Sequence, residues 1–145
     1  MNEEIEFLES IYQNVKFTQE SIARIIKMRD KNDELDSIIK QQYLEYKKIS
    51  NSAKAMIERR KKKVKEVGVM TKIATYVGIK ANMLNGEDIS QIALMLVEGS
   101  KVGTEQLNRY MKEYNVTNKN IINLANRLLN IEKDNIQKLK KFIWF

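Results

Sequence analysis

The sequence predicts an all-α protein, a four-helix bundle with one long connection, and three observations support this. The 145 residues contain no proline, whereas average usage would give about seven, and proline breaks helix interiors. Apolar residues recur at steps of three and four along most of the chain, which is the spacing of one helix face. Stretches rich in Val, Thr and aromatic residues, which are typical of strands, are missing.

We expect a single domain over residues 1–145, because this length is enough to bury a sizeable core. The spacing predicts helices over residues 3–28, 33–67, 70–84, 88–114 and 118–143. One straight helix over residues 33–84 would be about 78 Å long, twice the length of its partners. The chain must therefore break near Gly68, and residues 70–84 form a short fifth helix within the long connection.

Polar residues mark the expected starts of two helices. Asn32 precedes Asp33, Glu34 and Asp36, which crowd the first turn of the second helix as a helix start prefers. Thr117 is the expected N-cap of the last helix, because its hydroxyl can accept a hydrogen bond from the first turn.

The last helix carries an acidic residue in the middle of its apolar stripe. The next seam position after Leu128 is Glu132, and apolar residues resume at Ile136. The other helices also have polar or small residues near their middles. Because the middles of antiparallel helices lie at one level in a bundle, we expect a single polar layer, made of Gln19, Gln42, Glu45, Gly99, Gly103, Glu132 and Asn135.

Three interpretations of this layer remain open at the level of sequence. The first, which we favour, is a hydrogen-bonded layer that fixes helix register, with Gln19 and Gln42 contacting Glu132. The second is a site for a hard cation such as Mg²⁺, Mn²⁺ or Ca²⁺, which prefer oxygen ligands; its candidate ligands are Glu45, Glu132, Glu20 and Glu98. The third is a small-molecule pocket beside the two glycines.

Two stretches resemble the ferritin-like family, most closely a bacterial branch of it. They are Ile92–Ser100 (IALMLVEGS) and Ile131–Lys140 (IEKDNIQKLK). The resemblance covers nearly the whole chain as architecture, is specific in these two stretches alone, and brings no assigned activity. It implies a ferritin-like bundle with one long connection.

Ferritin-like di-iron enzymes place a glutamate on each of two helices and a Glu-x-x-His pair on each of the other two. In the corresponding place this chain has Glu132-x-x-Asn135, with asparagine instead of histidine. The second place holds Gln42-x-x-Glu45, with an amide first and a carboxylate last. Both histidines are missing, so the resemblance implies a member of the family without the di-iron ligands, and we expect no cofactor.

Histidine and cysteine are both absent from the sequence. The commonest general base in enzymes is therefore missing, as are thiolate metal ligands and cysteine nucleophiles. His-dependent triads and the usual zinc sites cannot be built. We therefore expect a protein that is not an enzyme.

The formal net charge is +7, and much of it comes from one basic run. Its members are Arg59, Arg60, Lys61, Lys62, Lys63 and Lys65. Such a run permits binding to nucleic acid. We favour a solvated helix end, because cations there offset the negative pole of the helix dipole and no aromatic residues are interleaved with the basic ones.

The acidic N-terminus, Met1–Glu6, lacks the pattern of a signal peptide. The longest apolar run, Ile92–Val97, is too short to span a bilayer. We expect a cytoplasmic protein without a membrane partner that acts by self-association or by binding another protein. The alternatives are a metal- or small-ligand-binding protein that uses the polar layer, and a basic protein that binds nucleic acid.

Overall fold

The computed structural model describes residues 2–29, 31–60 and 89–143. Its helices are α1 (Asn2–Arg29), α2 (Glu34–Arg59), α4 (Ile89–Glu113) and α5 (Lys119–Leu139), followed by the 3₁₀ turn η1 (Lys140–Phe142). The four long helices pack against each other, and the described residues contain no strand. The predicted all-α four-helix fold is confirmed.

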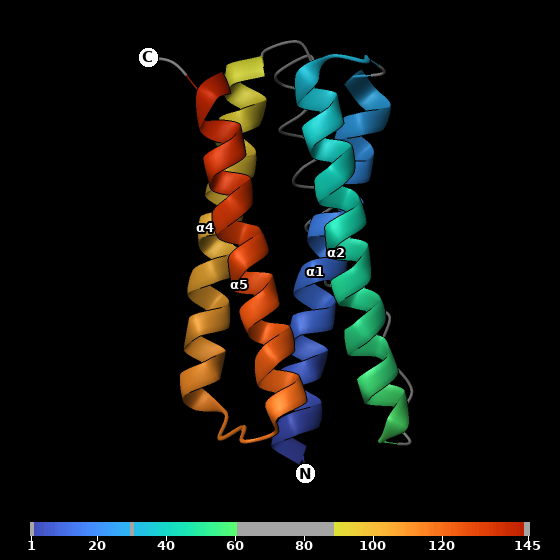
Figure 1. Ribbon diagram of the computed structural model, residues 1–145, viewed down its shortest axis with the longest axis vertical. Coiled ribbons are helices and arrows are strands. Elements are labelled where there is room, and N and C mark those ends of the chain that lie inside the picture. The colour runs from blue at the N-terminus through green and yellow to red at the C-terminus, as the bar shows by residue number, and fades with distance from the viewer. Residues whose placement is uncertain (1, 30, 61–88, 144–145) are drawn as a thin grey trace.

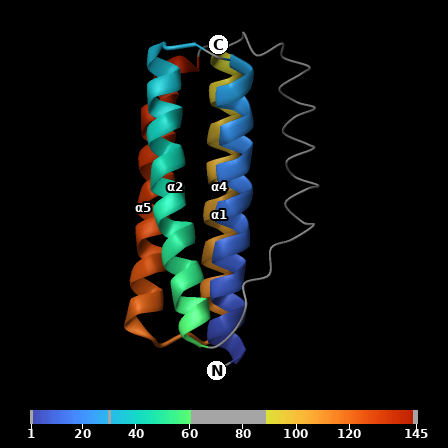
Figure 2. The same ribbon diagram turned by 90° about the vertical axis from the view of Figure 1, so that its right-hand side faces the viewer.

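The bundle consists of two antiparallel hairpins, α1–α2 and α4–α5 (Figure 1). The helices of each hairpin pack closely, α2 packs against α5 to join the hairpins, and α1 has a smaller contact with α4. Helices α2 and α4 run in the same direction (Figures 1 and 2). The chain therefore passes from one end of the bundle to the other between Arg60 and Ile89.

The observed helix bounds differ from the predicted ones mainly at the C-terminus. Helices α1 and α4 begin and end within one residue of the predictions. The prediction of one helix over 118–143 is wrong at its end, because α5 stops at Leu139 and the chain tightens into η1. There the Ile143 N–H bonds to the Lys140 carbonyl at 3.0 Å, an i→i+3 bond of the kind that often ends an α-helix. The predicted stretches 61–67 and 70–84 lie outside the described residues.

At two helix starts, the expected N-cap lies one residue before the residue that caps the helix in the structure. The side chain of Asp33, not Asn32, accepts the Asp36 N–H at the start of α2. The side chain of Asn118, not Thr117, accepts the N–H groups of Asn120 and Ile121 at the start of α5. In each case two adjacent residues can cap, and the second one does.

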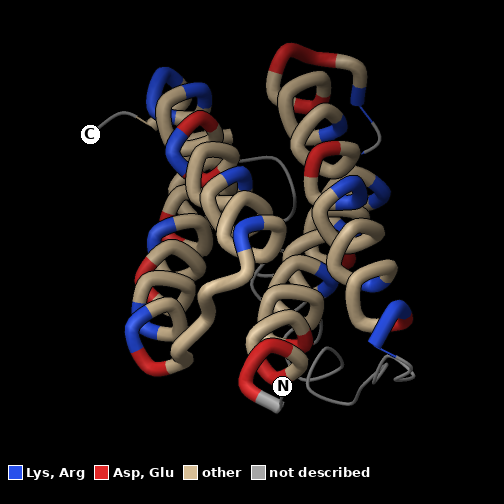
Figure 3. The backbone as a smooth tube through the Cα atoms, turned by 60° about the horizontal axis from the view of Figure 1, so that its bottom comes forward, with Lys and Arg blue, Asp and Glu red and all other residues tan. Residues whose placement is uncertain are grey.

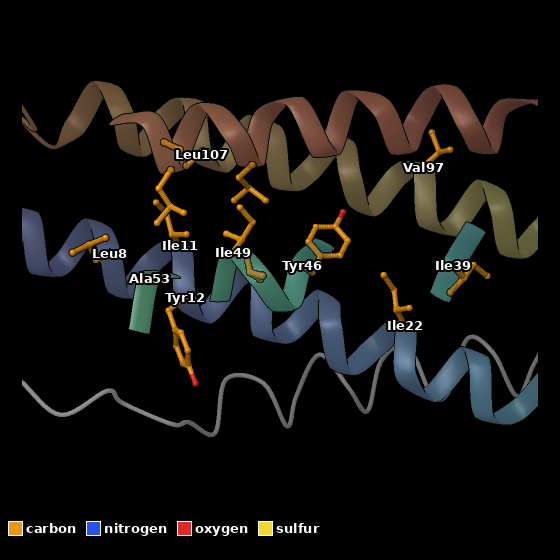
Figure 4. Packing of buried hydrophobic residues seen from close by; sticks show 14 of the residues in the cluster. Leu8, Ile11, Tyr12, Ile22, Ile39, Tyr46, Ile49, Ala53, Val97 and Leu107 are labelled. Carbon is orange, nitrogen blue, oxygen red and sulfur yellow. The ribbon is translucent and has the colours of Figure 1, made fainter. Parts of the chain in front are cut away.

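The apolar stripes of the four helices meet in one core that extends along the bundle (Figure 4). Leu8, Ile39, Ile49 and Ile121 are among its fully buried members. Charged residues of both signs are interspersed along the outside of all four helices (Figure 3). Among the helices that the structure describes, none has the length and apolar character needed to cross a membrane.

Candidate functional site

Glu132 lies in the core, 5% exposed, at the point where α2, α4 and α5 meet. The Tyr46 hydroxyl of α2 donates a hydrogen bond to Glu132 Oε1. Ser100 Oγ of α4 donates to the same oxygen at 3.3 Å. Asn135 Nδ2, one turn further along α5, donates to the Tyr46 hydroxyl oxygen at 2.9 Å. We call these four residues the carboxylate cluster; in Figure 4, Tyr46 extends from α2 toward α4 and α5.

The two glycines of α4 have different surroundings. A Cβ atom added at Gly103 would lie 2.5 Å from Glu132 Oε2, so the missing side chain makes room for the carboxylate. A Cβ atom added at Gly99 would meet no atom within 4 Å in residues 2–29, 31–60 and 89–143. Packing therefore explains Gly103 and does not explain Gly99.

Burial raises the pKa of Glu132 to about 7, although the hydrogen bonds from Tyr46 and Ser100 oppose the shift. Burial also raises the pKa of Tyr46 well above its usual value, and the neighbouring charge of Glu132 adds to the effect. The tyrosine therefore stays protonated, while the carboxyl group changes charge near neutral pH. The cluster can hold or release one proton inside the core.

The expected contacts of Gln19 and Gln42 with Glu132 are not found. Gln19 is buried, and its Oε1 accepts a hydrogen bond from Ser50 Oγ at 3.1 Å. Gln42 is also buried, and its Nε2 has no hydrogen-bond partner among the described residues. Gln19 and Gln42 therefore do not belong to the carboxylate cluster, and α2 presents Gln42, Tyr46 and Ser50 at steps of four residues.

A cavity of about 80 Å³ lies between α1, α2 and α4 beside the carboxylate cluster. Its apolar lining is Phe17, Ile22, Ile25, Met95 and Leu96. Tyr46 and Ser100 line it as well, so the cavity and the carboxylate cluster share the two residues that donate to Glu132.

Gly99 also lines this cavity and is exposed. The cavity therefore reaches the surface of the bundle beside Gly99, where α4 has no side chain to cover it. Gln42 lines the cavity from α2.

The candidate metal ligands do not come together as a di-iron or hard-cation site would require. Glu20 and Glu98 are exposed, and Glu132 is hydrogen-bonded to hydroxyl groups. Glu45 is partly buried, and its Oε1 has no hydrogen-bond partner in the described part of the chain. In residues 2–29, 31–60 and 89–143, no three acidic side chains are grouped so that they could hold a metal ion. The described residues do not fit the di-iron site that the resemblance implies.

The basic run begins at the end of α2. Arg59 is exposed, whereas Arg60 bonds to the Met56 carbonyl at 2.8 Å and its Nη2 lies 3.2 Å from Glu4 Oε1. Arg60 thus links the last turn of α2 to the first turn of α1. Residues Lys61, Lys62, Lys63 and Lys65 lie outside the described part of the chain.

Sequence reasoning missed the two hydroxyl groups that hold Glu132. The Tyr46 ring fits the apolar seam of its helix, yet its hydroxyl must find a partner when buried. Ser100 is small, as its neighbour Gly99 is, and its spacing does not distinguish a packing role from a hydrogen-bonding one. A buried glutamate needs hydrogen-bond donors. The available signal in the sequence is therefore the presence of residues with a hydroxyl group at seam positions of the other helices.

Comparisons with models of protein families, with curated proteins and with solved structures find no match for this chain. The function of the site is therefore argued from its own residues.

Proposed function

We propose that this protein is a cytoplasmic, ferritin-like four-helix bundle that binds a small, mainly apolar ligand in the cavity beside the carboxylate cluster. The observation that carries the proposal is Gly99. A glycine inside a helix costs about 1 kcal/mol relative to alanine, and no neighbouring atom of the described residues requires one at this position. Access to the cavity explains the glycine where packing does not.

The lining and the size of the cavity limit the ligand. Ligand sites are mostly apolar with a few placed polar groups, and this cavity combines an apolar wall with Gln42, Tyr46 and Ser100. A cavity of about 150 Å³ accepts benzene. The volume here, about 80 Å³, suits a smaller molecule or the end of a longer one that enters beside Gly99.

The helix directions support the ferritin-like part of the proposal. Ferritin-like bundles have one long crossover connection. In this chain α2 and α4 run in the same direction, and both hairpins are antiparallel (Figure 1), which is the arrangement that one crossover produces.

Self-association, the first expectation from the sequence, has weaker support and stays a prediction. Among the described residues, the exposed large apolar side chains are Met28, Leu44, Leu94 and Val102. They are distributed over α1, α2 and α4. An interface between proteins usually needs a contiguous apolar centre, and only Leu94 and Val102 of these four residues share a helix.

Xenon, which enters apolar cavities, tests the proposed function in solution. We expect backbone amide NMR shifts at Gly99 and Met95 that saturate as xenon pressure rises. The variant Gly99→Leu places a side chain at the opening and should abolish these shifts. Lys101→Leu, an exposed position on the same helix, is the control and should leave them unchanged. The absence of saturable shifts in the wild type, or equal shifts in Gly99→Leu, would contradict the proposal.

A further inference from the structure

The polar groups of the cavity identify the chemical class of its ligand. We propose that the cavity selects an uncharged molecule with a small apolar body and one oxygen acceptor, such as a short ketone, and that Gln42 donates a hydrogen bond to that oxygen. This inference rests on the proposed function, because it names the ligand of the same cavity.

Charged ligands are disfavoured by the lining. Among the described residues that line the cavity there is no lysine, arginine, aspartate or glutamate. Glu132 is close, but the Tyr46 and Ser100 hydroxyl groups already donate to it. An ion that entered the cavity would lose its hydration and gain no opposite charge, which is unfavourable. The ligand is therefore neutral.

The hydroxyl groups of the lining already donate their protons within the protein. Thr18 Oγ1 donates to the Asn14 carbonyl at 3.1 Å, and Ser21 Oγ donates to the Phe17 carbonyl at 2.8 Å. The hydroxyl groups of Ser100 and Tyr46 bond to Glu132. A ligand oxygen would have to break one of these bonds to receive a proton from any of them.

Gln42 lines the cavity with a side-chain donor that has no partner in the part of the chain that the structure describes. It is 2% exposed, and its Nε2 makes no hydrogen bond to these residues. An unsatisfied buried donor is unfavourable, and the terminal torsion of glutamine is soft. The amide can therefore turn its N–H toward a ligand oxygen, and binding relieves the unsatisfied group.

An NMR titration with three four-carbon probes tests the ligand class. The probes are butanone, butylammonium and butyrate, and the signals are the Gly99 backbone amide and the Gln42 side-chain amide. We expect saturable shifts of both signals with butanone and none with the two ions. Loss of one hydrogen bond in Gln42→Met should weaken butanone binding about fivefold, while the exposed control Gln41→Met binds as the wild type does.

Xenon separates the two proposals. If xenon binds the wild type and butanone does not, or if the charged probes bind as well as butanone, the ligand class is wrong and the cavity remains a binding site. Equal butanone affinity in Gln42→Met and the wild type would also overturn the role of Gln42. If neither xenon nor butanone binds, the proposed function itself fails. Xenon binding to Gln42→Met shows that this variant keeps the fold and the cavity.

Discussion

Glu132 is unusual because its carboxyl group lies in the core and no cationic side chain of the described residues forms an ion pair with it. Its hydrogen-bond donors are the neutral hydroxyl groups of Tyr46 and Ser100. Two neutral hydroxyl donors stabilise the charged carboxylate less than water does, so the pKa of Glu132 rises from 4.5 to about 7. The folded state therefore binds a proton more tightly than the unfolded state does.

This shift determines how stability depends on pH. Between the unfolded and folded pKa values the folded state binds more protons, so the free energy of unfolding falls as pH rises through this window. Glu132→Gln keeps the acceptor oxygen and removes the titration. We expect the stability of the variant relative to the wild type to increase by about 3 kcal/mol between about pH 4 and pH 9. Urea unfolding at a series of pH values measures this.

The control for this prediction is Glu105→Gln, which removes an exposed carboxylate from α4. Its stability relative to the wild type should change much less with pH. If the free energies of unfolding of Glu132→Gln and the wild type change in parallel between about pH 4 and pH 9, the pKa of the carboxyl group is not raised, and the prediction is wrong.

Part of this residue-scale arrangement could be predicted from the sequence. Glu132 interrupts an apolar stripe, and Asn135 and Gly103 occupy the same level, so all three were expected in a mid-bundle layer. The partners of Glu132 could not be predicted, since Tyr46 fits an apolar seam as well as a polar cluster. Which seam residue donates to a carboxylate depends on the rotation of each helix about its axis, and spacing alone does not give that.

Helix α4 offers a matched pair of glycine substitutions. Gly99→Ala adds a methyl group in open space and should stabilise the protein by about 1 kcal/mol through helix propensity. Gly103→Ala gains the same propensity, but its Cβ would lie 2.5 Å from Glu132 Oε2. Because displacing this buried carboxylate strains the cluster, we expect Gly103→Ala to be less stable than Gly99→Ala by about 2 kcal/mol.

Thermal unfolding of the two α4 variants at the same pH measures the difference, and each variant serves as the control for the other. Equal stabilities would mean that the Glu132 side chain can move away from a Cβ atom at position 103 without loss of stability. The explanation that Gly103 is needed to make room for the carboxylate would then be wrong.

The elements themselves were the most predictable part of the molecule. Long amphipathic stripes fix which residues form α1, α2, α4 and α5, because burial of one face dominates helix stability in proteins. The ends were less predictable. At the start of α2, Asn32 and Asp33 can both cap, and Asp33 also forms an ion pair with the buried Arg29. This contact between the end of α1 and the start of α2 favours the second residue, and N-cap preference alone does not distinguish the two.

At the scale of the whole molecule, Tyr46 connects the two hairpins. It lies on α2 in the first hairpin and contacts Glu132 and Asn135 of α5 in the second. Tyr46→Phe removes the hydroxyl and leaves Ser100 as the remaining donor to the carboxylate. We expect a loss of about 2 kcal/mol in the free energy of unfolding at pH 8, since a buried charged acceptor loses its main donor.

Tyr43→Phe is the matched control, because Tyr43 lies on the same helix and is only partly buried. Denaturant unfolding should show little change for it. A Tyr46→Phe variant as stable as Tyr43→Phe would mean that the hydroxyl does not join the hairpins.

The two hairpins meet around a buried, hydroxyl-bound carboxyl group beside the cavity. The most direct test of this arrangement is a pH titration of the Glu132 side-chain carboxyl carbon by ¹³C NMR in the wild-type protein. We expect a midpoint at about pH 7, because burial raises this pKa. A midpoint near 4.5, the ordinary value, would place the carboxyl group in water and contradict the arrangement of the site.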